Sequence, residues 1–344
     1  MRMTQQQKTA VMVGAAGVGA MMLARVWRER NAIDFAGKTV IVTGGSRGLG
    51  LVIARELADE GARLVLIARD KETLERAEAD LRERQPFGEV LTVPADVRKR
   101  DDADRVVALA RERFGAVDVL INNAGIIQAG PMEHMQLSDY QDAMDTHFWG
   151  PLYMTMAVLP YMRRQGSGRI VNIASIGGRI SVPHMLPYSA SKFALVGLSD
   201  GLRAELARDN ILVTTVCPGL MRTGSPGNAL FKGKRPQEYA WFAIADSLPL
   251  ASIDARRAAR QIVDACRRGD AELVITMQAK LAILARTAAP EIFADVMATM
   301  NGLLPGPAPD GDEARPGREN ESKWVPSVLT TLTQSAAKAN NEES

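Results

Sequence analysis

Short apolar runs alternate along the chain with longer segments whose apolar residues recur every three or four positions. The first run, Lys38–Thr43, is rich in β-branched residues and lies between Gly37 and Gly44, which is typical of a buried parallel strand. Further strands are predicted at 63–68, 90–95, 117–121, 169–175, 211–217 and 272–276. Helices are predicted to end at Glu60 and to span 71–85, 99–114 and 255–268. This alternation predicts a doubly wound α/β fold, Rossmann-like, with right-handed crossovers and helices on both faces of a parallel sheet.

Residues suited to ligand binding gather where these strands are predicted to end. At or just beyond strand ends lie Gly44, Arg69, Asp96, Asn123, Ser175 and Pro218. Ligands of open parallel sheets bind at the carboxyl ends of the strands. The pattern therefore predicts one ligand site at this edge of the sheet.

A glycine-rich turn joins the first strand to the first helix. It reads Gly44-Gly-Ser46-Arg47-Gly48-Leu49-Gly50, a G-x-x-x-G-x-G spacing rather than the commoner G-x-G-x-x-G. Glycines at such a turn let the backbone approach a pyrophosphate, whose charge is favoured at the amino terminus of a helix. The turn predicts a dinucleotide site.

The end of the second strand bears on which dinucleotide binds. An acidic residue there bonds the ribose 2′-hydroxyl of NAD, whereas arginine accommodates the 2′-phosphate of NADP. Here Ala68 is followed by Arg69, and Arg47 lies in the glycine turn. Two guanidiniums are able to grip one phosphate, so NADP(H) is favoured over NAD. The alternative is that both arginines are solvated surface residues.

Tyr188 and Lys192 are four residues apart in Tyr188-Ser-Ala-Ser-Lys192, so on a helix they share one face. A neighbouring cation stabilises a phenolate and lowers the tyrosine pKa, which makes the phenol a usable general acid or base. Ser175, at a strand end, is placed to hold a carbonyl oxygen in line with that phenol. Without a cofactor site elsewhere, the pair would be an ordinary helix surface.

Composition narrows the classes of function. The chain has 344 residues, of which 46% are hydrophobic and 24% charged, with a formal net charge of +2. These values are ordinary for a globular domain with extensions. The sequence shows no sign of the basic face that nucleic-acid binding would need. The histidines His134, His147 and His184 show no metal-ligand spacing. Cys217 and Cys266 form no close motif, which favours a reducing compartment.

In their order along the chain, these motifs resemble the short-chain dehydrogenase/reductase family in its single-domain form. The resemblance spans roughly residues 35–275 and is carried by Thr43-Gly44-x-x-x-Gly48-x-Gly50, Asp96, Asn122-Asn-Ala-Gly125, Ser175, Tyr188-x-x-x-Lys192 and Pro218-Gly219. It implies the strand order 3-2-1-4-5-6-7 and hydride transfer between a nicotinamide and a carbonyl or alcohol carbon.

The resemblance also implies roles for particular residues. Tyr188 would be the acid/base, Ser175 would orient the reacting oxygen, and Lys192 would lower the tyrosine pKa and bond the nicotinamide ribose. Asp96 and Val97 would contact the adenine. Residues 218–223, among them Pro218, Gly219 and Thr223, would wrap the nicotinamide amide.

One position departs from the family pattern. Where the family has asparagine in the helix after the fourth strand, this chain reads His147-Phe-Trp-Gly150. The family asparagine helps to hold a water in a proton relay beneath the lysine. His147 either sustains or weakens that relay, or is a packed helix residue without a catalytic part.

The amino-terminal segment, residues 1–30, contains an uncharged stretch from Ala10 to Ala24 between a basic start and the arginines Arg25, Arg28 and Arg30. Fifteen residues are short for a membrane span, which needs about 20 apolar residues. A membrane anchor is favoured, with the following domain facing the cytoplasm. The alternatives are a cleaved signal peptide and a helix docked on protein.

The catalytic domain is predicted at 31–277, additional helices at 278–302, and a Pro/Gly-rich linker with a mobile tail at 303–344. Residues 223–250 are predicted to be irregular, and their aromatic content suggests a lipophilic substrate, although packing of a lid helix explains it almost as well. The expected function is an NADP(H)-dependent oxidoreductase, with a possible homo-oligomer as the assembled form. The alternatives are a low-turnover NADP-binding sensor or scaffold and an NAD-dependent alcohol dehydrogenase.

Overall fold

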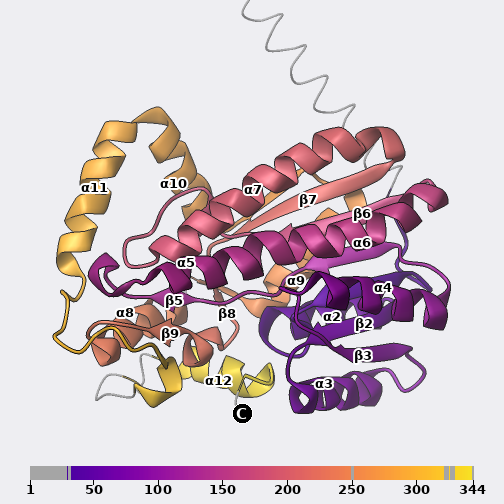
Figure 1. Ribbon diagram of the computed structural model, residues 1–344, viewed down its shortest axis with the longest axis horizontal. Coiled ribbons are helices and arrows are strands. Elements are labelled where there is room, and N and C mark those ends of the chain that lie inside the picture. The colour runs from indigo at the N-terminus through magenta and orange to yellow at the C-terminus, as the bar shows by residue number, and fades with distance from the viewer. Residues whose placement is uncertain (1–28, 30–31, 249–251, 321–324, 326–329, 343–344) are drawn as a thin grey trace, which may run out of the picture.

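A seven-stranded parallel sheet forms the centre of the computed structural model, which describes residues 29, 32–248, 252–320, 325 and 330–342 (Figure 1). Its strand order is β11-β7-β6-β4-β1-β2-β3. The strands are β1 (Thr39–Thr43), β2 (Arg63–Ala68), β3 (Val90–Pro94), β4 (Val119–Asn122), β6 (Gly168–Ile173), β7 (Ile211–Pro218) and β11 (Glu272–Ile275). Renumbered among themselves along the chain, they give the predicted order 3-2-1-4-5-6-7, and the doubly wound fold is confirmed.

Helices cover both faces of this sheet. Helices α2 (Gly48–Asp59), α3 (Lys71–Arg84) and α9 (Ala255–Arg268) pack on one face, and α4 (Arg100–Phe114), α6 (Gly150–Gln165) and α7 (Leu186–Leu206) pack on the other. Successive side chains of a strand point to opposite faces. In β1, Val40 and Val42 accordingly belong to the first apolar core and Ile41 to the second, all of them fully buried. This two-sided burial explains why the strands read as unbroken apolar runs.

The segment after β7 differs from the prediction that 223–250 is irregular. It contains β8 (Leu220–Arg222), β9 (Leu230–Phe231) and α8 (Arg235–Ser247), and β10 (Ser252–Asp254) follows it. Strand β9 pairs with β5 (Gln128–Ala129) and β12 (Arg315–Pro316). The apolar face of α8 packs on Phe231 and Val325, which lie outside the helix in sequence. Because Val325 is distant in sequence, the pattern along 223–250 gave no sign of this packing.

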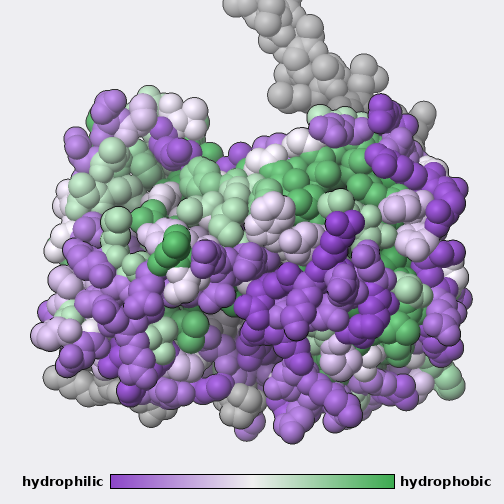
Figure 2. Space-filling model, in the orientation of Figure 1, coloured by the Kyte–Doolittle hydropathy of each residue, from purple (hydrophilic) through white to green (hydrophobic). Residues whose placement is uncertain are grey.

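Beyond β11, the chain forms two helices, α10 (Met277–Ala288) and α11 (Pro290–Leu303), where one or two were expected. They stand out from one end of the molecule (Figure 1). Apolar side chains remain exposed along both helices: Met277, Leu281, Leu284, Ile292, Val296, Met300 and Leu303. Figure 2 shows apolar residues on this hairpin and over α6 and α7.

The expectation of a mobile tail is corrected for residues 330–342. Helix α12 (Thr331–Ala339) packs on α8, where the Ser247 hydroxyl donates to Thr333 Oγ1 over 2.6 Å and the Thr333 hydroxyl donates to Asp246 Oδ2 over 3.0 Å. The buried polar contacts of α12 are with residues more than 80 positions away, so local composition gave no sign of them.

No helix in the part of the chain that the structure describes is long and apolar enough to cross a membrane. The anchor predicted at Ala10–Ala24 lies outside those residues, so it stays a prediction.

Candidate active site

A cavity of about 610 Å³ opens at the carboxyl ends of the sheet strands. Most of the predicted site residues line it: Gly44, Ser46, Arg47, Gly48, Leu49, Arg69, Asp96, Val97, Asn123, Tyr188, Lys192 and Thr223. The others are absent from its lining: Gly50, His147, Ser175, Pro218 and Gly219. The structure therefore brings most of the residues predicted from the strand ends around one cavity.

The glycine turn brings the start of α2 against the end of β1. Gly48 begins the helix with a φ of +55°, a conformation that costs glycine little. At Gly50 an added Cβ would lie 2.1 Å from the Gly44 carbonyl oxygen, so no larger residue fits without moving the turn. The amino-terminal N–H groups of α2 consequently face the cavity, where a helix favours an anion.

Thr43 and Asn123 clamp this turn to β4. The Thr43 hydroxyl accepts from the backbone N–H groups of Asn123 (2.9 Å) and Ala124 (3.0 Å). The Asn123 amide donates to the carbonyl oxygens of Thr43 (3.0 Å) and Gly44 (3.2 Å). Asn123 thus holds the shape of the turn as well as lining the cavity.

The charged residues predicted for the adenosine end lie on the cavity wall. Arg69 is exposed just after β2, and Arg47 is about half-exposed, in the turn. Asp96 is bonded by the Arg98 guanidinium, with the shortest contact at 2.7 Å, and these hydrogen bonds hold the pKa of Asp96 below its ordinary value. The wall therefore carries arginine charge, while the Asp96 carboxylate is already neutralised by Arg98.

Tyr188 and Lys192 lie in α7, one turn apart, and both line the cavity. The Lys192 ammonium lies 5.7 Å from the centre of the tyrosine ring and donates to the Ile173 carbonyl over 2.8 Å. Ser175 caps the short helix η3 (Ile176–Gly178) by accepting from the Gly177 N–H over 3.0 Å. A Cβ on Gly177 would lie 3.0 Å from the tyrosine ring, so the serine loop packs directly on Tyr188.

The expectation that Lys192 lowers the tyrosine pKa is not met in this arrangement. Burial raises the pKa of Tyr188, and a hydrogen bond with Ser175 acts in the opposite direction. Burial also lowers the pKa of Lys192 to about 7. A lysine that loses its charge so readily gives little electrostatic help to a phenolate, which is the physical reason for the difference.

His147 lies in a π-helical turn, η2 (Asp145–Trp149), and its side chain is completely buried. Its Nε2 accepts from the Ile126 N–H over 3.1 Å, so its Nδ1 carries the proton and donates to Ser191 Oγ over 2.8 Å. The Ser191 hydroxyl in turn donates to the Tyr188 carbonyl over 2.8 Å. Burial lowers the pKa of His147 well below its ordinary value, so the ring is neutral. Of the readings left open by the sequence, this geometry favours a packed histidine, whose two nitrogens bond to protein rather than to a relay water.

Sequence reasoning missed residues that line the cavity from the later part of the chain. Asn228 and Arg318 are two of them, and Glu342 contacts the glycine turn itself. Asn228 and Arg318 lie in short 3₁₀ helices and Glu342 lies in the tail, all without a motif, so no signal in the sequence pointed to them. Ser191 was also missed, although it lies inside the Tyr188–Lys192 motif.

The fold and site define a Rossmann-type oxidoreductase with a tyrosine and a lysine beside a dinucleotide turn. Residues 38–230 match the family model described as short chain dehydrogenase. The chain belongs to the short-chain dehydrogenase/reductase family.

Individual relatives agree with this assignment. Over 294 residues, covering 83% of this chain and 93% of the relative, the sequence is 32% identical to dehydrogenase/reductase SDR family member 7B of Danio rerio. It is 40% identical over 183 residues, 53% of this chain and 63% of the relative, to the ketoacyl reductase HetN of a Nostoc species. Among solved structures, L-sorbose reductase from Gluconobacter frateurii, complexed with NADPH and L-sorbose, superposes with a TM-score of 0.63 at 28% identity, covering 71% of this chain and 97% of that one.

Proposed function

We propose that this protein is an NADP(H)-dependent oxidoreductase that interconverts a carbonyl and an alcohol on a lipophilic substrate. The observation that carries the proposal is the meeting of Ser175, Tyr188 and Lys192 beside a cavity whose other wall is the glycine turn. The turn fits a dinucleotide because the α2 amino terminus and Arg47 provide an anion site next to it.

The bound cofactor would supply or accept the hydride, and the protein supplies orientation and proton transfer. The Tyr188 phenol protonates the carbonyl oxygen in reduction and takes the proton back in oxidation. Ser175 donates a hydrogen bond to the same oxygen and aligns it with the phenol. The Lys192 ammonium, now bonded to Ile173, is within reach of the cavity and would bond a ribose hydroxyl. His147 holds the start of α7 through Ser191, so that Tyr188 faces the cavity.

A preference for NADP(H) is supported by the positive charge at the adenosine end. Arg47 and Arg69 both line the cavity, and no acidic residue occupies the end of β2 at position 68. A charge-assisted hydrogen bond to a phosphate contributes about 1.5–3 kcal/mol. L-sorbose reductase, whose structure contains NADPH, has the same fold.

A lipophilic substrate is supported by a second cavity, of about 490 Å³, beside the loop that precedes α7. Apolar residues from three parts of the chain contribute to its wall: Met132, Val182, Leu186, Met297 and Leu304. Val182 in this wall packs against the same apolar cluster as Tyr188. By contrast, Phe231 and Phe242 of the predicted lid pack into a buried core, so their aromatic content is not itself a substrate surface.

The protein is proposed to be held at the cytoplasmic face of a membrane through residues 1–30, with residues 31–277 as the catalytic domain. The support is the uncharged stretch at 10–24 followed by arginines. After gentle lysis, the full chain should sediment with membranes and resist a high-salt wash, and a chain that starts at Asn31 should be soluble and active. Recovery of the full chain in the soluble fraction would contradict this placement.

A screen of carbonyl compounds with NADPH and with NADH tests the proposed function. Among ketosteroids, acyl ketones and retinaldehydes, the screen should find carbonyl compounds that are reduced with NADPH. Arg47→Gln combined with Arg69→Gln should weaken the binding of NADPH far more than that of NADH. Arg208, an exposed arginine outside both cavities, provides the matched control Arg208→Gln. An equal loss of affinity for NADPH and for NADH would show that the arginines do not contact the 2′-phosphate.

A further inference from the structure

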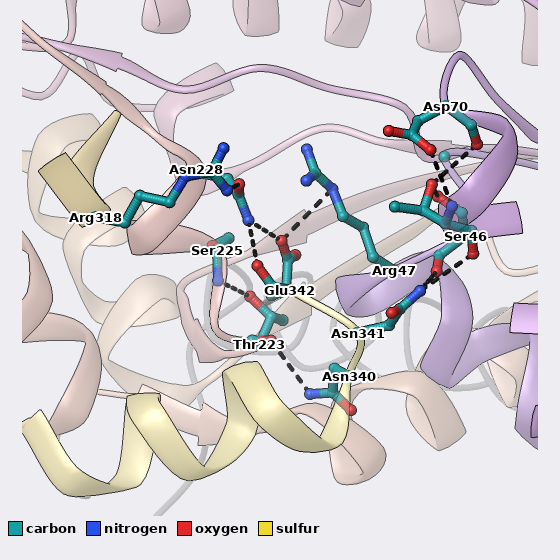
Figure 3. Close-up of polar contacts among 12 residues, drawn as sticks. Ser46, Arg47, Asp70, Thr223, Ser225, Asn228, Arg318, Asn340, Asn341 and Glu342 are labelled. Carbon is teal, nitrogen blue, oxygen red and sulfur yellow. Dashed lines mark hydrogen bonds and ion pairs between the residues drawn. The ribbon is translucent and has the colours of Figure 1, made fainter. Parts of the chain in front are cut away.

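The carboxyl-terminal tail lies directly on the glycine turn (Figure 3). After α12 ends, the Asn340 carbonyl accepts from the Gly48 N–H over 2.8 Å, which is the first N–H of α2. The Asn341 amide donates to the Ser46 carbonyl over 2.8 Å and to the Thr73 carbonyl over 3.1 Å. Three consecutive residues of the tail, Asn340 to Glu342, thus take up groups that face the cofactor cavity.

Glu342 brings a carboxylate to the same place. Its side chain is only 6% exposed, and one of its oxygens accepts from the Asn228 amide over 2.6 Å and lies 3.5 Å from Arg47 Nε. A Cβ added to Gly48 would come within 2.4 Å of its other oxygen. Burial raises the pKa of Glu342, and Arg47 is the main group that counteracts this. An anion between an arginine and a helix amino terminus occupies the position that suits a phosphate.

Further contacts fix this segment in place. Arg55, on α2, donates to the Ala339 carbonyl over 3.0 Å and to Asn340 Oδ1 over 3.3 Å. Arg76, on α3, donates to Asn341 Oδ1 over 2.8 Å. The Asn340 amide donates to the Thr223 carbonyl over 3.2 Å, on the opposite wall. The tail therefore bridges both sides of the cavity entrance through side chains that the catalytic steps do not use.

We propose that Asn340–Glu342 is an internal competitor of the cofactor: it fills the phosphate end of the cavity, and the cofactor binds after the tail has left. This inference rests on the proposed function, because it takes the glycine turn to be the phosphate site. When a ligand binds only the tail-free form, its apparent affinity equals its intrinsic affinity multiplied by the fraction of molecules in that form. The tail is thus a device that sets how much cofactor is needed for activity.

The test compares the nucleotide affinity of the full chain with the nucleotide affinities of a chain ending at Ala339 and of the Glu342→Gln variant. The probes are NADPH, NADH and adenosine 2′,5′-bisphosphate, titrated by calorimetry. The chain ending at Ala339 should bind NADPH and the bisphosphate about tenfold more tightly, and Glu342→Gln should bind them several-fold more tightly. The reason is that the fraction of molecules whose cavity holds the tail falls. The controls are a chain ending at Glu342 and Glu291→Gln on exposed α11, neither of which should change the affinity.

A second measurement does not depend on the variants folding. In the full chain, addition of NADPH should increase hydrogen exchange at the amides of residues 340–342, since the tail leaves its site. Unchanged exchange, or equal affinity of the full and shortened chains for NADPH, would overturn the inference while leaving the proposed function intact. Failure of every nucleotide to bind to either chain would overturn both.

Discussion

The two ends of the cofactor cavity are built in different ways. At the catalytic end, Tyr188 and Lys192 share one helix, and Ser175 lies 13 positions before the tyrosine, at the end of a central strand. At the phosphate end, the glycine turn meets a tail residue from the far end of the chain: Asn341 and Ser46 are 295 positions apart. The Tyr188–Lys192 pair and the glycine turn are set by local spacing and can be read in sequence, whereas the position of the tail on the turn depends on how distant segments pack.

The largest expected effect is at the catalytic end. Tyr188→Phe removes only the ionisable oxygen, so turnover should fall by about 10²–10⁴-fold, the usual contribution of a general acid or base. NADPH affinity should stay near that of the unaltered protein, as measured by calorimetry. Tyr161→Phe, on α6 beside Arg111, is the matched control and should keep full turnover. Near-normal turnover of Tyr188→Phe would remove this residue from the mechanism.

A glycine of the phosphate end should be intolerant to one added methyl group. In Gly50→Ala the new Cβ would lie 2.1 Å from the Gly44 carbonyl oxygen and 2.6 Å from the Asn123 amide nitrogen, so the turn must move. We expect a loss of about 1–3 kcal/mol in unfolding free energy, as for other overpacked sites, and weaker NADPH binding. Gly197→Ala, in α7 with open space around it, should instead be neutral or stabilising. Equal urea midpoints for the two variants would contradict this account.

The attachment of α12 should depend on pH through Asp246. Burial raises the pKa of Asp246 to about 7, so its protonated form is favoured in the folded protein. The stability gained from this protonation is fully present below the unfolded pKa of about 4 and is lost as the pH rises through about 7. Between pH 5 and pH 8, the unfolding free energy should fall by on the order of 1–3 kcal/mol more in the unaltered protein than in Asp246→Asn. Parallel denaturation curves of the two proteins at both pH values would show that Asp246 does not titrate in this range.

The smallest effect on turnover is expected at His147. His147→Asn leaves the Ile126 N–H without its acceptor, which should cost about 1–3 kcal/mol of stability. Because both ring nitrogens bond to protein, turnover should change far less than in Tyr188→Phe. A kcat loss comparable to that of Tyr188→Phe, in a variant whose thermal unfolding shows it to be folded, would reveal a specific task for the histidine.

The sequence by itself determined the doubly wound fold and the gathering of the candidate site residues at the strand ends. It did so because buried strands are short apolar runs and the glycine turn and the Tyr188–Lys192 pair are local patterns with fixed spacing. Only the tertiary structure decided that α8 is a helix packed on Phe231, that His147 has both nitrogens bonded inside the protein, and that Glu342 lies against Arg47. Each of these depends on burial and packing that the local pattern does not show. For a polar tail residue that belongs to no motif, the sequence alone does not identify the residue that it contacts.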